Sequence, residues 1–194
     1  RPDGCARCKT VSGWDLPTEL EVTGQRFAVR SDFRAVMDAL AALNDTALPE
    51  QARCLAFLQI FYPDWHHLPD ANEALRQAMV FVNLGQPVQQ NQPHRPELVH
   101  WDTDVQLIAP AVDKVLGYSC RACAYLHWWD FIGAFQNIGE GLFASVVNIR
   151  NKRARGKKLD KAEKEFAREN ADLIGTVNRF TPEEEAFFKR LGLA

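Results

Sequence analysis

The chain has 194 residues, 46% of them hydrophobic and 25% charged, which is the composition of an ordinary globular protein with a substantial core. Its formal net charge of -2 excludes a global attraction to nucleic acid or to an acidic membrane surface, so any electrostatic argument must be local. No stretch approaches the roughly eighteen apolar residues that a membrane span needs, and the start of the chain does not resemble a secretory signal. We therefore expect a cytosolic protein.

The N-terminal part of the sequence predicts an arm followed by a β-hairpin. Residues 1–18 contain scattered glycines and charges without any period, which is typical of an extended arm. From Leu20 to Arg30, apolar and polar residues alternate on both sides of Gly24. This alternation around a turn residue predicts a hairpin, and we expect no further sheet.

Helical spacing of apolar residues predicts three helices after the hairpin. They run from about Phe33 to Leu43, from Glu50 to Tyr62 and from about Ala71 to Val82. Ser31 or Asp32 is placed to cap the first helix, and Asp70 with Glu73 has the spacing of a capping box at the start of the third.

The composition changes at residues 86–100, which are rich in proline, glutamine and asparagine. Such a segment is typical of a linker or a long surface loop. It divides the chain into the arm at 1–18, a hairpin and helical subdomain at 19–85, and a helical subdomain at 101–194. The sequence leaves open whether these subdomains pack as one body.

Further helices are predicted after the linker. Asp102 is placed to cap a helix that ends at Gly117, in which Pro110 predicts a kink or a late start. A short helix follows Leu142, Asp160 and Glu163 start a charged helix through Ile174, and Thr181-Pro182 starts a last one with Phe187, Phe188 and Leu191. The fold class is therefore mainly α, a multi-helix globular bundle with one small N-terminal β-hairpin.

The stretch from Tyr125 to Phe135 is the most aromatic in the chain. Its large apolar side chains fall around most of a helical circumference, which predicts a central, buried helix. His127 and the adjacent tryptophans are then core residues with satisfied ring N–H groups rather than catalytic ones. The predicted structural core comprises Phe33, Leu126, His127, Trp128, Trp129, Phe131 and Phe135.

Two Cys-x-x-Cys pairs suggest a zinc site as one alternative, since four thiolates at Cys5, Cys8, Cys120 and Cys123 have suitable spacing within each pair. The gap between the pairs is far longer than in compact zinc ribbons. A redox pair is a further alternative. We favour reduced thiols that pack as small apolar residues, and we expect no cofactor.

Arg150 to Lys158 is a run in which six of nine residues are basic. Such a run contacts phosphates in some proteins, but it also occurs as a solvated connector. The absence of interleaved aromatics and of an overall basic charge favours the connector. We expect nucleic acid not to be the partner.

Motifs of nucleotide-binding and hydrolytic enzymes are missing from the sequence. It has no phosphate-binding glycine loop, no His-Glu-x-x-His and no Gly-x-Ser-x-Gly elbow. We therefore expect a binding protein with no catalytic residues.

Two segments carry a resemblance to a known family. Val29-Arg30-Ser31-Asp32-Phe33-Arg34 and Leu126-His127-Trp128-Trp129-Asp130-Phe131, in this order behind a hairpin, resemble a family of siphophage and prophage proteins from tail-morphogenesis modules. By gene position, this family looks like the tail assembly chaperones, which are encoded between the major tail protein and the tape-measure protein.

The resemblance implies a helical assembly factor in the cytoplasm of the bacterial host. It would bind the tape-measure protein, help to recruit the major tail protein, form homo-oligomers and be absent from the finished virion. We look for its binding surface beside the aromatic helix or at Phe187, Phe188 and Leu191. The alternatives are a zinc-containing regulatory or nucleic-acid-binding module and a structural tail component that stays in the virion.

Overall fold

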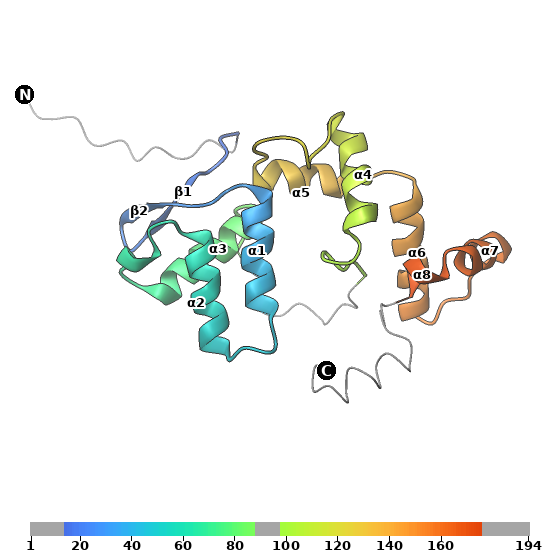
Figure 1. Ribbon diagram of the computed structural model, residues 1–194, viewed down its shortest axis with the longest axis horizontal. Coiled ribbons are helices and arrows are strands. Elements are labelled where there is room, and N and C mark those ends of the chain that lie inside the picture. The colour runs from blue at the N-terminus through green and yellow to red at the C-terminus, as the bar shows by residue number, and fades with distance from the viewer. Residues whose placement is uncertain (1–13, 88–97, 176–194) are drawn as a thin grey trace, which may run out of the picture. The chain divides into compact units, whose positions relative to one another are not determined.

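A computed structural model describes residues 14–87 and 98–175 of the chain, while 1–13, 88–97 and 176–194 lie outside the described part. The described residues form eight α-helices and one two-stranded antiparallel sheet, which confirms the predicted mainly α fold with a single N-terminal hairpin (Figure 1). They divide into two compact units. Of the described residues, the first unit comprises 14–87 and 123–133, and the second comprises 98–122 and 134–175.

The hairpin of the first unit consists of β1 (Glu19–Val22) and β2 (Gln25–Ala28). Val22 pairs with Gln25, so the turn holds only Thr23 and Gly24. Both turn residues have positive φ, 48° and 83°, as a type I′ turn requires. Gly24 adopts this conformation freely, whereas the β-branched Thr23 adopts it at a cost.

Three helices of twelve residues complete most of the first unit: α1 (Phe33–Asn44), α2 (Glu50–Phe61) and α3 (Ala71–Val82), with a short 3₁₀ helix at Trp65–His67. α1 and α2 lie side by side (Figure 1). The core of this unit contains the buried aromatic rings of α2 and α3, Phe57, Phe61 and Phe81, together with the buried Tyr62 that follows α2.

Polar groups at the helix ends fix where these helices begin. The Asp32 side chain caps α1 and the Asp70 side chain caps α3, as predicted. Glu73 was predicted to complete a capping box with Asp70, but its carboxylate instead accepts hydrogen bonds from Arg76 at 2.6 and 2.8 Å and from Gln77. These bonds from Arg76 and Gln77 hold the pKa of Glu73 below its usual value.

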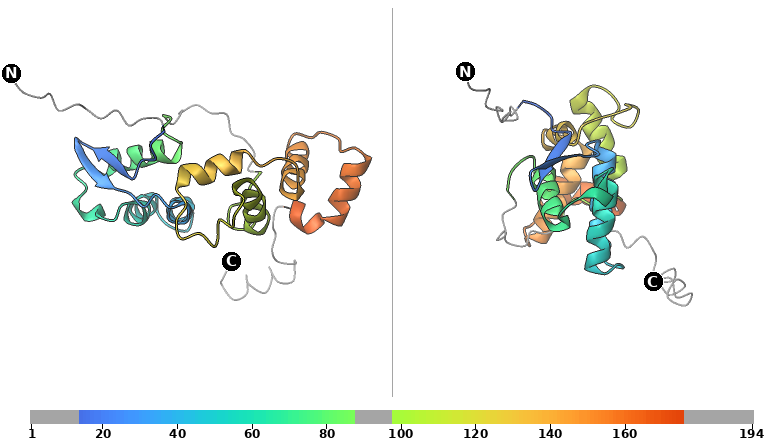
Figure 2. Two further views of the ribbon diagram at one scale, coloured as in Figure 1. Left: turned by 90° about the horizontal axis from the view of Figure 1, so that it is seen from above. Right: turned by 90° about the vertical axis from the view of Figure 1, so that its left-hand side faces the viewer.

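The second unit contains α4 (Val105–Leu116), α6 (Leu142–Ala154), α7 (Lys161–Glu169) and α8 (Ala171–Ile174). α6 is packed against α4, α7 and α8, and it lies between α4 and α7 in Figures 1 and 2. Its inward face meets the other helices in a small core of four buried residues, Val146, Ile149, Ala167 and Ile174.

Several helix boundaries of the second unit differ from the sequence prediction. α4 begins after Asp104 rather than at Asp102, and it continues through Pro110 to Gly117, whose φ of 77° ends it. Asp160 and Glu163 form the predicted capping box of α7. That helix does not run on to Ile174, because Asn170 separates α7 from α8 and donates its side-chain amide to the Phe166 carbonyl.

The aromatic segment forms α5 (Trp128–Gln136), which starts two residues later than the apolar pattern suggests. Its residues up to Gly133 belong to the first unit and those from Ala134 to the second. Most of the predicted arm and of the proline-rich segment lies outside the described residues, so the division of the chain at 86–100 stays a prediction.

Candidate functional site

The two segments that carry the family resemblance meet in the first unit. The Phe33 amide donates to the Leu126 carbonyl at 3.0 Å, and the Trp128 amide donates to the Ser31 carbonyl at 2.8 Å. These bonds pair Asp32 with His127 as a short antiparallel bridge. Segments more than ninety residues apart in the sequence therefore form one structural element, which we call the motif junction, residues 31–34 with 123–129.

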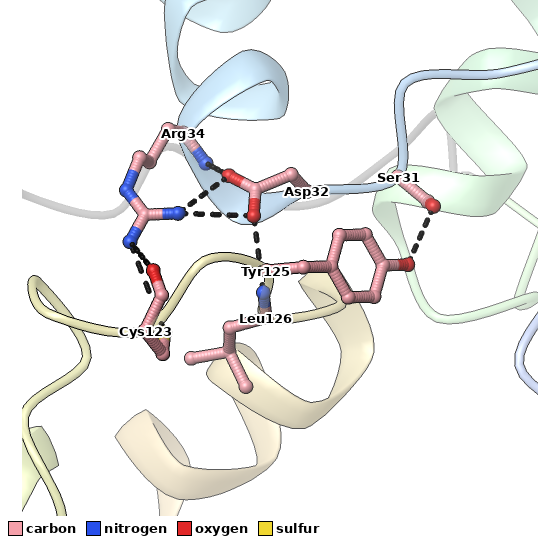
Figure 3. Close-up of polar contacts among 6 residues, drawn as sticks. All are labelled: Ser31, Asp32, Arg34, Cys123, Tyr125 and Leu126. Carbon is pink, nitrogen blue, oxygen red and sulfur yellow. Dashed lines mark hydrogen bonds and ion pairs between the residues drawn. The ribbon is translucent and has the colours of Figure 1, made fainter.

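Asp32 is the centre of the motif junction (Figure 3). One carboxylate oxygen accepts the Arg34 amide at 3.0 Å and caps α1, while the other accepts the Leu126 amide at 3.0 Å. The Arg34 guanidinium pairs with the same carboxylate and donates onward to the Cys123 carbonyl at 2.9 Å. A helix cap is thus also the anchor for a distant loop.

His127 is buried, and both of its ring nitrogens are engaged. Nδ1 accepts the Trp129 amide at 3.0 Å, so the ring proton sits on Nε2, which donates to the Pro17 carbonyl at 3.0 Å. The imidazole thereby caps the start of α5. A neutral ring with both nitrogens used in this way packs and caps, and it leaves no lone pair for a metal ion.

The two indoles of the aromatic segment cap another helix end. Trp128 Nε1 donates to the Val82 carbonyl at 2.9 Å, and Trp129 Nε1 donates to the Phe81 carbonyl at 2.8 Å. Both carbonyls belong to the last turn of α3, and the Phe81 carbonyl also accepts the Leu84 amide at 3.1 Å. A Cβ atom added at Gly85 would lie 3.4 Å from the Trp129 ring, so the glycine backbone completes this contact.

The predicted core residues are distributed as follows. Phe33, Leu126, His127, Trp128 and Phe131 are buried, and the Phe33 and Phe131 rings stack with centroids 4.3 Å apart. Trp129 is half-buried in the first unit, and Phe135 is half-buried in the second, where it contacts Trp101. The motif junction is accordingly a folding element in which polar and aromatic groups satisfy one another.

A groove in the second unit is the candidate binding site. It has a volume of about 410 Å³ and lies between α4 and the segment that joins α5 to α6. Its apolar lining residues are Leu107, Pro110, Ala111, Val115, Ile138, Leu142, Phe143 and Ala144. Val115 and Leu142 are 41% and 47% exposed, so a bound partner could cover apolar surface there. Lys114 is at the rim, where its ammonium donates to the Glu140 carbonyl at 3.5 Å.

A buried ion pair braces the helices of this unit. Arg150 in α6 donates to both oxygens of Asp104, at 2.5 and 3.0 Å, and to the carbonyls of Leu98 and Leu173 at 3.0 and 2.7 Å. Burial alone would raise the pKa of Asp104, but the hydrogen bonds from Arg150 and from the His100 amide outweigh it, so this pKa lies below its usual value. Arg150 thus fixes the start of α4 against α6.

The basic run at 150–158 therefore has a mixed role. Arg150 is a buried structural group, and the Lys152 ammonium pairs with Glu163 of α7. That pairing, with the Asp160 amide as second donor, lowers the pKa of Glu163. The remaining cations of the run, Arg153, Arg155, Lys157 and Lys158, are exposed.

The cysteines show no arrangement for a metal in the described residues. Cys120 is buried, and its amide donates to the Asp113 carboxylate at 2.7 Å. Burial would raise the pKa of Asp113, but this bond and those from Ser119 and the Cys120 side chain lower it. In the ranges 14–87 and 98–175, no three His, Cys, Asp or Glu side chains are grouped to hold a metal ion. Cys5 and Cys8 lie outside these ranges, so the four-thiolate site stays untested.

The partner-binding residues predicted at Phe187, Phe188 and Leu191 also lie outside the described residues. Sequence reasoning placed a binding surface beside the aromatic helix without naming any residue that lines the groove, and it missed the ion pair of Asp104 and Arg150. One signal was available for the ion pair: Arg150 follows Val146 by four residues and Phe143 by seven, so it falls on the apolar face of α6. Among the described helices, none is long and apolar enough to cross a membrane.

Comparison with known proteins places the chain in a family. The model of the family described as Bacteriophage Gp15 protein matches residues 14–121, more than half of the chain. The matched range includes Asp32, Phe33 and Arg34 of the motif junction and all of α4, but it ends before the aromatic segment. Neither the curated proteins nor the solved structures contain a chain that matches. The chain therefore belongs to the Bacteriophage Gp15 protein family.

Proposed function

We propose that this protein is a phage or prophage tail assembly chaperone, which binds the tape-measure protein in the host cytoplasm and acts by binding rather than by catalysis. The observation that carries the proposal is the apolar groove between α4 and the segment before α6, in a chain that belongs to a bacteriophage family. The tail-module resemblance of the sequence supplies the partner.

The chemistry of the groove suits a helical client. A long helical protein with an apolar stripe aggregates when it is free, and a groove that covers part of the stripe keeps it soluble by mass action, without ATP. A volume of about 410 Å³ lies within the usual range of binding pockets, about 300–1,000 Å³, and leaves room for apolar side chains of the client. Lys114 is the one charged residue that lines the groove from the α4 side, which favours apolar contacts.

The exposure of the groove residues also supports reversible binding. Covering the exposed halves of Val115 and Leu142 contributes about 1–2 kcal/mol, to which the apolar side chains of the client add a similar amount. Association itself costs at least about 4 kcal/mol, so the net affinity of a single site stays modest. Modest affinity is what a chaperone needs if the major tail protein is to displace it during tube polymerisation.

Co-expression tests the proposal. The neighbouring tape-measure protein is expressed alone, with the wild-type chain, and with a Val115→Lys/Leu142→Lys variant, and its soluble yield is measured. We expect the wild type to raise the yield and the variant to lose this effect, because two ammonium groups would have to enter an apolar groove. Leu55→Lys is the matched control, since Leu55 is an equally exposed apolar residue, 46%, on α2 of the first unit.

Two results would count against the proposal. If the wild-type chain does not change the soluble yield of the tape-measure protein, that protein is not its client. If the wild type and the groove variant give equal yields, the groove is not the binding site. Mass spectrometry of purified virions separates the runner-up function: we expect the chain to be missing, whereas its presence at fixed stoichiometry would identify a structural tail component.

A further inference from the structure

We infer that a segment of this same chain, residues 181–191, covers the apolar groove until a client displaces it. The sequence predicts a short helix in this segment, which begins at Thr181-Pro182 and carries Phe187, Phe188 and Leu191. The segment lies outside the described residues. The inference rests on the proposed function, because it concerns the regulation of the same binding site.

The described part of the chain ends beside the core that supports the groove. Ile174 of α8 belongs to the buried core of the second unit, and Leu107, which lines the groove, packs against the same core. Gly175 is the last described residue. The 181–191 segment is therefore tethered to the unit that contains the groove, a few residues beyond the core of that unit.

The tether is long enough to reach the groove. The Arg150 guanidinium donates to the Leu173 carbonyl of α8, and Leu142 at the groove precedes Arg150 by eight residues, or about 12 Å along α6. Packed helices such as α6 and α8 lie about 8–10 Å apart. These two steps, taken at right angles, combine to about 16 Å. Residues 176–181 span up to about 20 Å when extended, so the 181–191 segment reaches the groove.

The apolar side of the segment matches the surface that the described residues leave uncovered at the groove. On a helix, Phe187, Phe188 and Leu191 fall within an arc of about 100°, so they form one apolar stripe. A helix of about ten residues is marginally stable alone, and packing of its apolar stripe supplies most of its stability. Val115 and Leu142, which are nearly half-exposed, offer the apolar surface for this packing.

The charges of the segment also fit the groove. Glu183 and Glu184 precede the two phenylalanines by four residues, so they continue the same side of the helix by one turn. α6 begins after Gly141, which has no side chain to cap the first amides of the helix. The Lys114 ammonium lies at the neighbouring Glu140 carbonyl, and its charge offsets that of the Glu140 carboxylate. The positive end of the α6 dipole is therefore left to attract the two glutamates.

A second hollow of the unit, between α6 and α7, suits the segment less well. It has a volume of about 290 Å³, and three of its six lining residues, Ser145, Asn148 and Glu163, are polar, compared with four of fourteen in the groove. It therefore offers less apolar surface to the phenylalanines. The start of α7 at this hollow is already capped by Asp160, so its amides do not attract the glutamates of the segment.

Tethering allows a weak contact to cover the groove. A segment on a short tether has an effective concentration of about 1 mM near its site. If the segment binds the groove with a Kd of about 0.1 mM, the groove is covered about ten times as often as it is open, and a client binds about tenfold more weakly than to an open groove. A client at saturating concentration displaces the segment and covers the groove more completely.

Hydrogen exchange of the full-length chain tests the inference without any client. The wild type is compared with Phe187→Gln/Phe188→Gln, which removes most of the apolar stripe and changes none of the described residues. We expect exchange at residues 106–115 and 137–144 to be up to about tenfold faster in this variant, because its groove is open.

A peptide that imitates the client supplies the second measurement. A labelled helical peptide with four leucines on one stripe is bound to each full-length chain, and its affinity is measured by fluorescence anisotropy. We expect about tenfold tighter binding to Phe187→Gln/Phe188→Gln than to the wild type. Lys189→Gln/Arg190→Gln is the matched control: both residues lie outside the apolar stripe, so exchange and affinity should stay as in the wild type.

The outcomes separate the two proposals. Groove exchange that is equal in the wild type and in Phe187→Gln/Phe188→Gln would overturn the segment, and peptide binding that Val115→Lys/Leu142→Lys abolishes would leave the client role in place. Faster groove exchange in the variant without any peptide binding would support the segment and count against the client role.

Two further results would assign the segment to another place. Faster exchange at residues 145–149 and 162–166 of the variant, in place of the groove, would overturn the inference in favour of the second hollow. Groove protection that is lost on dilution of the wild type would show that the segment comes from a second copy, and it would overturn the contact within one chain.

Discussion

Replacing Asp104 by asparagine should destabilise the second unit by about 3–5 kcal/mol, the usual cost of removing one partner of a buried ion pair. Both side chains of the Asp104–Arg150 pair are only 5% exposed. The asparagine keeps the size of the side chain but leaves the guanidinium without a counter-charge, so its desolvation is no longer offset. A loss of this size is a large part of the stability of a typical domain, about 5–15 kcal/mol.

The second substitution completes a double-mutant cycle. Arg150→Met alone removes the donors of the Leu98 and Leu173 carbonyls as well as the charge, so we expect it to cost at least as much as Asp104→Asn. Asp104→Leu/Arg150→Met removes both buried charges and should cost clearly less than the two single changes together. The difference between the summed losses of the two single variants and the loss in the double variant measures the coupling energy between the two residues.

Hydrogen exchange combined with urea denaturation is the assay, because amide protection in α4 and α6 reports on this unit alone. Glu163→Gln is the control in the same unit: its partner Lys152 is 30% exposed, so this pair should contribute at most about 1 kcal/mol. A loss below about 1 kcal/mol for Asp104→Asn, or unchanged exchange in α4, would refute the view that this pair braces the groove.

Three further predictions concern pH and the first unit. The pKa of Asp104 in the folded chain lies below its value of about 3.9 in an unfolded chain, so the stability that its carboxylate contributes is complete above that pH and is lost as the pH falls through the folded-state pKa. The urea midpoint of unfolding should therefore fall less between pH 7 and pH 3 in Asp104→Asn than in the wild type. Midpoints that fall equally with pH in the two proteins would contradict this. His127→Phe should lower the free energy of unfolding by about 2–4 kcal/mol, since the Trp129 amide and the Pro17 carbonyl lose their partner. His127→Asn keeps an acceptor for the Trp129 amide, so thermal unfolding should show a smaller loss of stability. Equal losses in the two variants would exclude the capping role. Thr23→Asn should stabilise the fold by about 1 kcal/mol by relieving the positive φ of a β-branched residue, and an unchanged or lower melting temperature would count against a strained turn.

The sequence was sufficient to predict the elements whose signal is local. The alternation around Gly24 predicts the hairpin because the turn fixes its register. Asp32 predicts the start of α1 because its carboxylate bonds to the first turn of the helix that directly follows it. In each case, residues within one or two turns of one another determine the outcome.

Boundaries and partners that depend on distant residues were harder to predict. Asp102 looked like the cap of α4, but the helix begins after Asp104, whose carboxylate caps no amide of the helix and instead binds Arg150, forty-six positions away. The aromatic pattern begins at Leu126, but α5 starts at Trp128, since the preceding residues pair with Ser31 and Phe33. Neither long-range contact leaves a periodic signal in the sequence.

The groove was also hard to predict, because residues distant in the sequence form it. Its walls come from α4 and from residues 137–144, and each wall alone resembles an ordinary half-exposed helix or loop. The exposed Val115 and Leu142 stand out only when burial is known. The run at 150–158 likewise separates into structural and exposed cations only when the positions of Asp104 and Glu163 are known.

The most direct test of the proposed binding role is a hydrogen-exchange footprint of the chain in complex with the tape-measure protein. The groove account predicts slower exchange at residues 106–115 and 137–144 in the complex, with the hairpin at 19–28 unchanged. Protection confined to the first unit, or the same footprint in the Val115→Lys/Leu142→Lys variant, would contradict it.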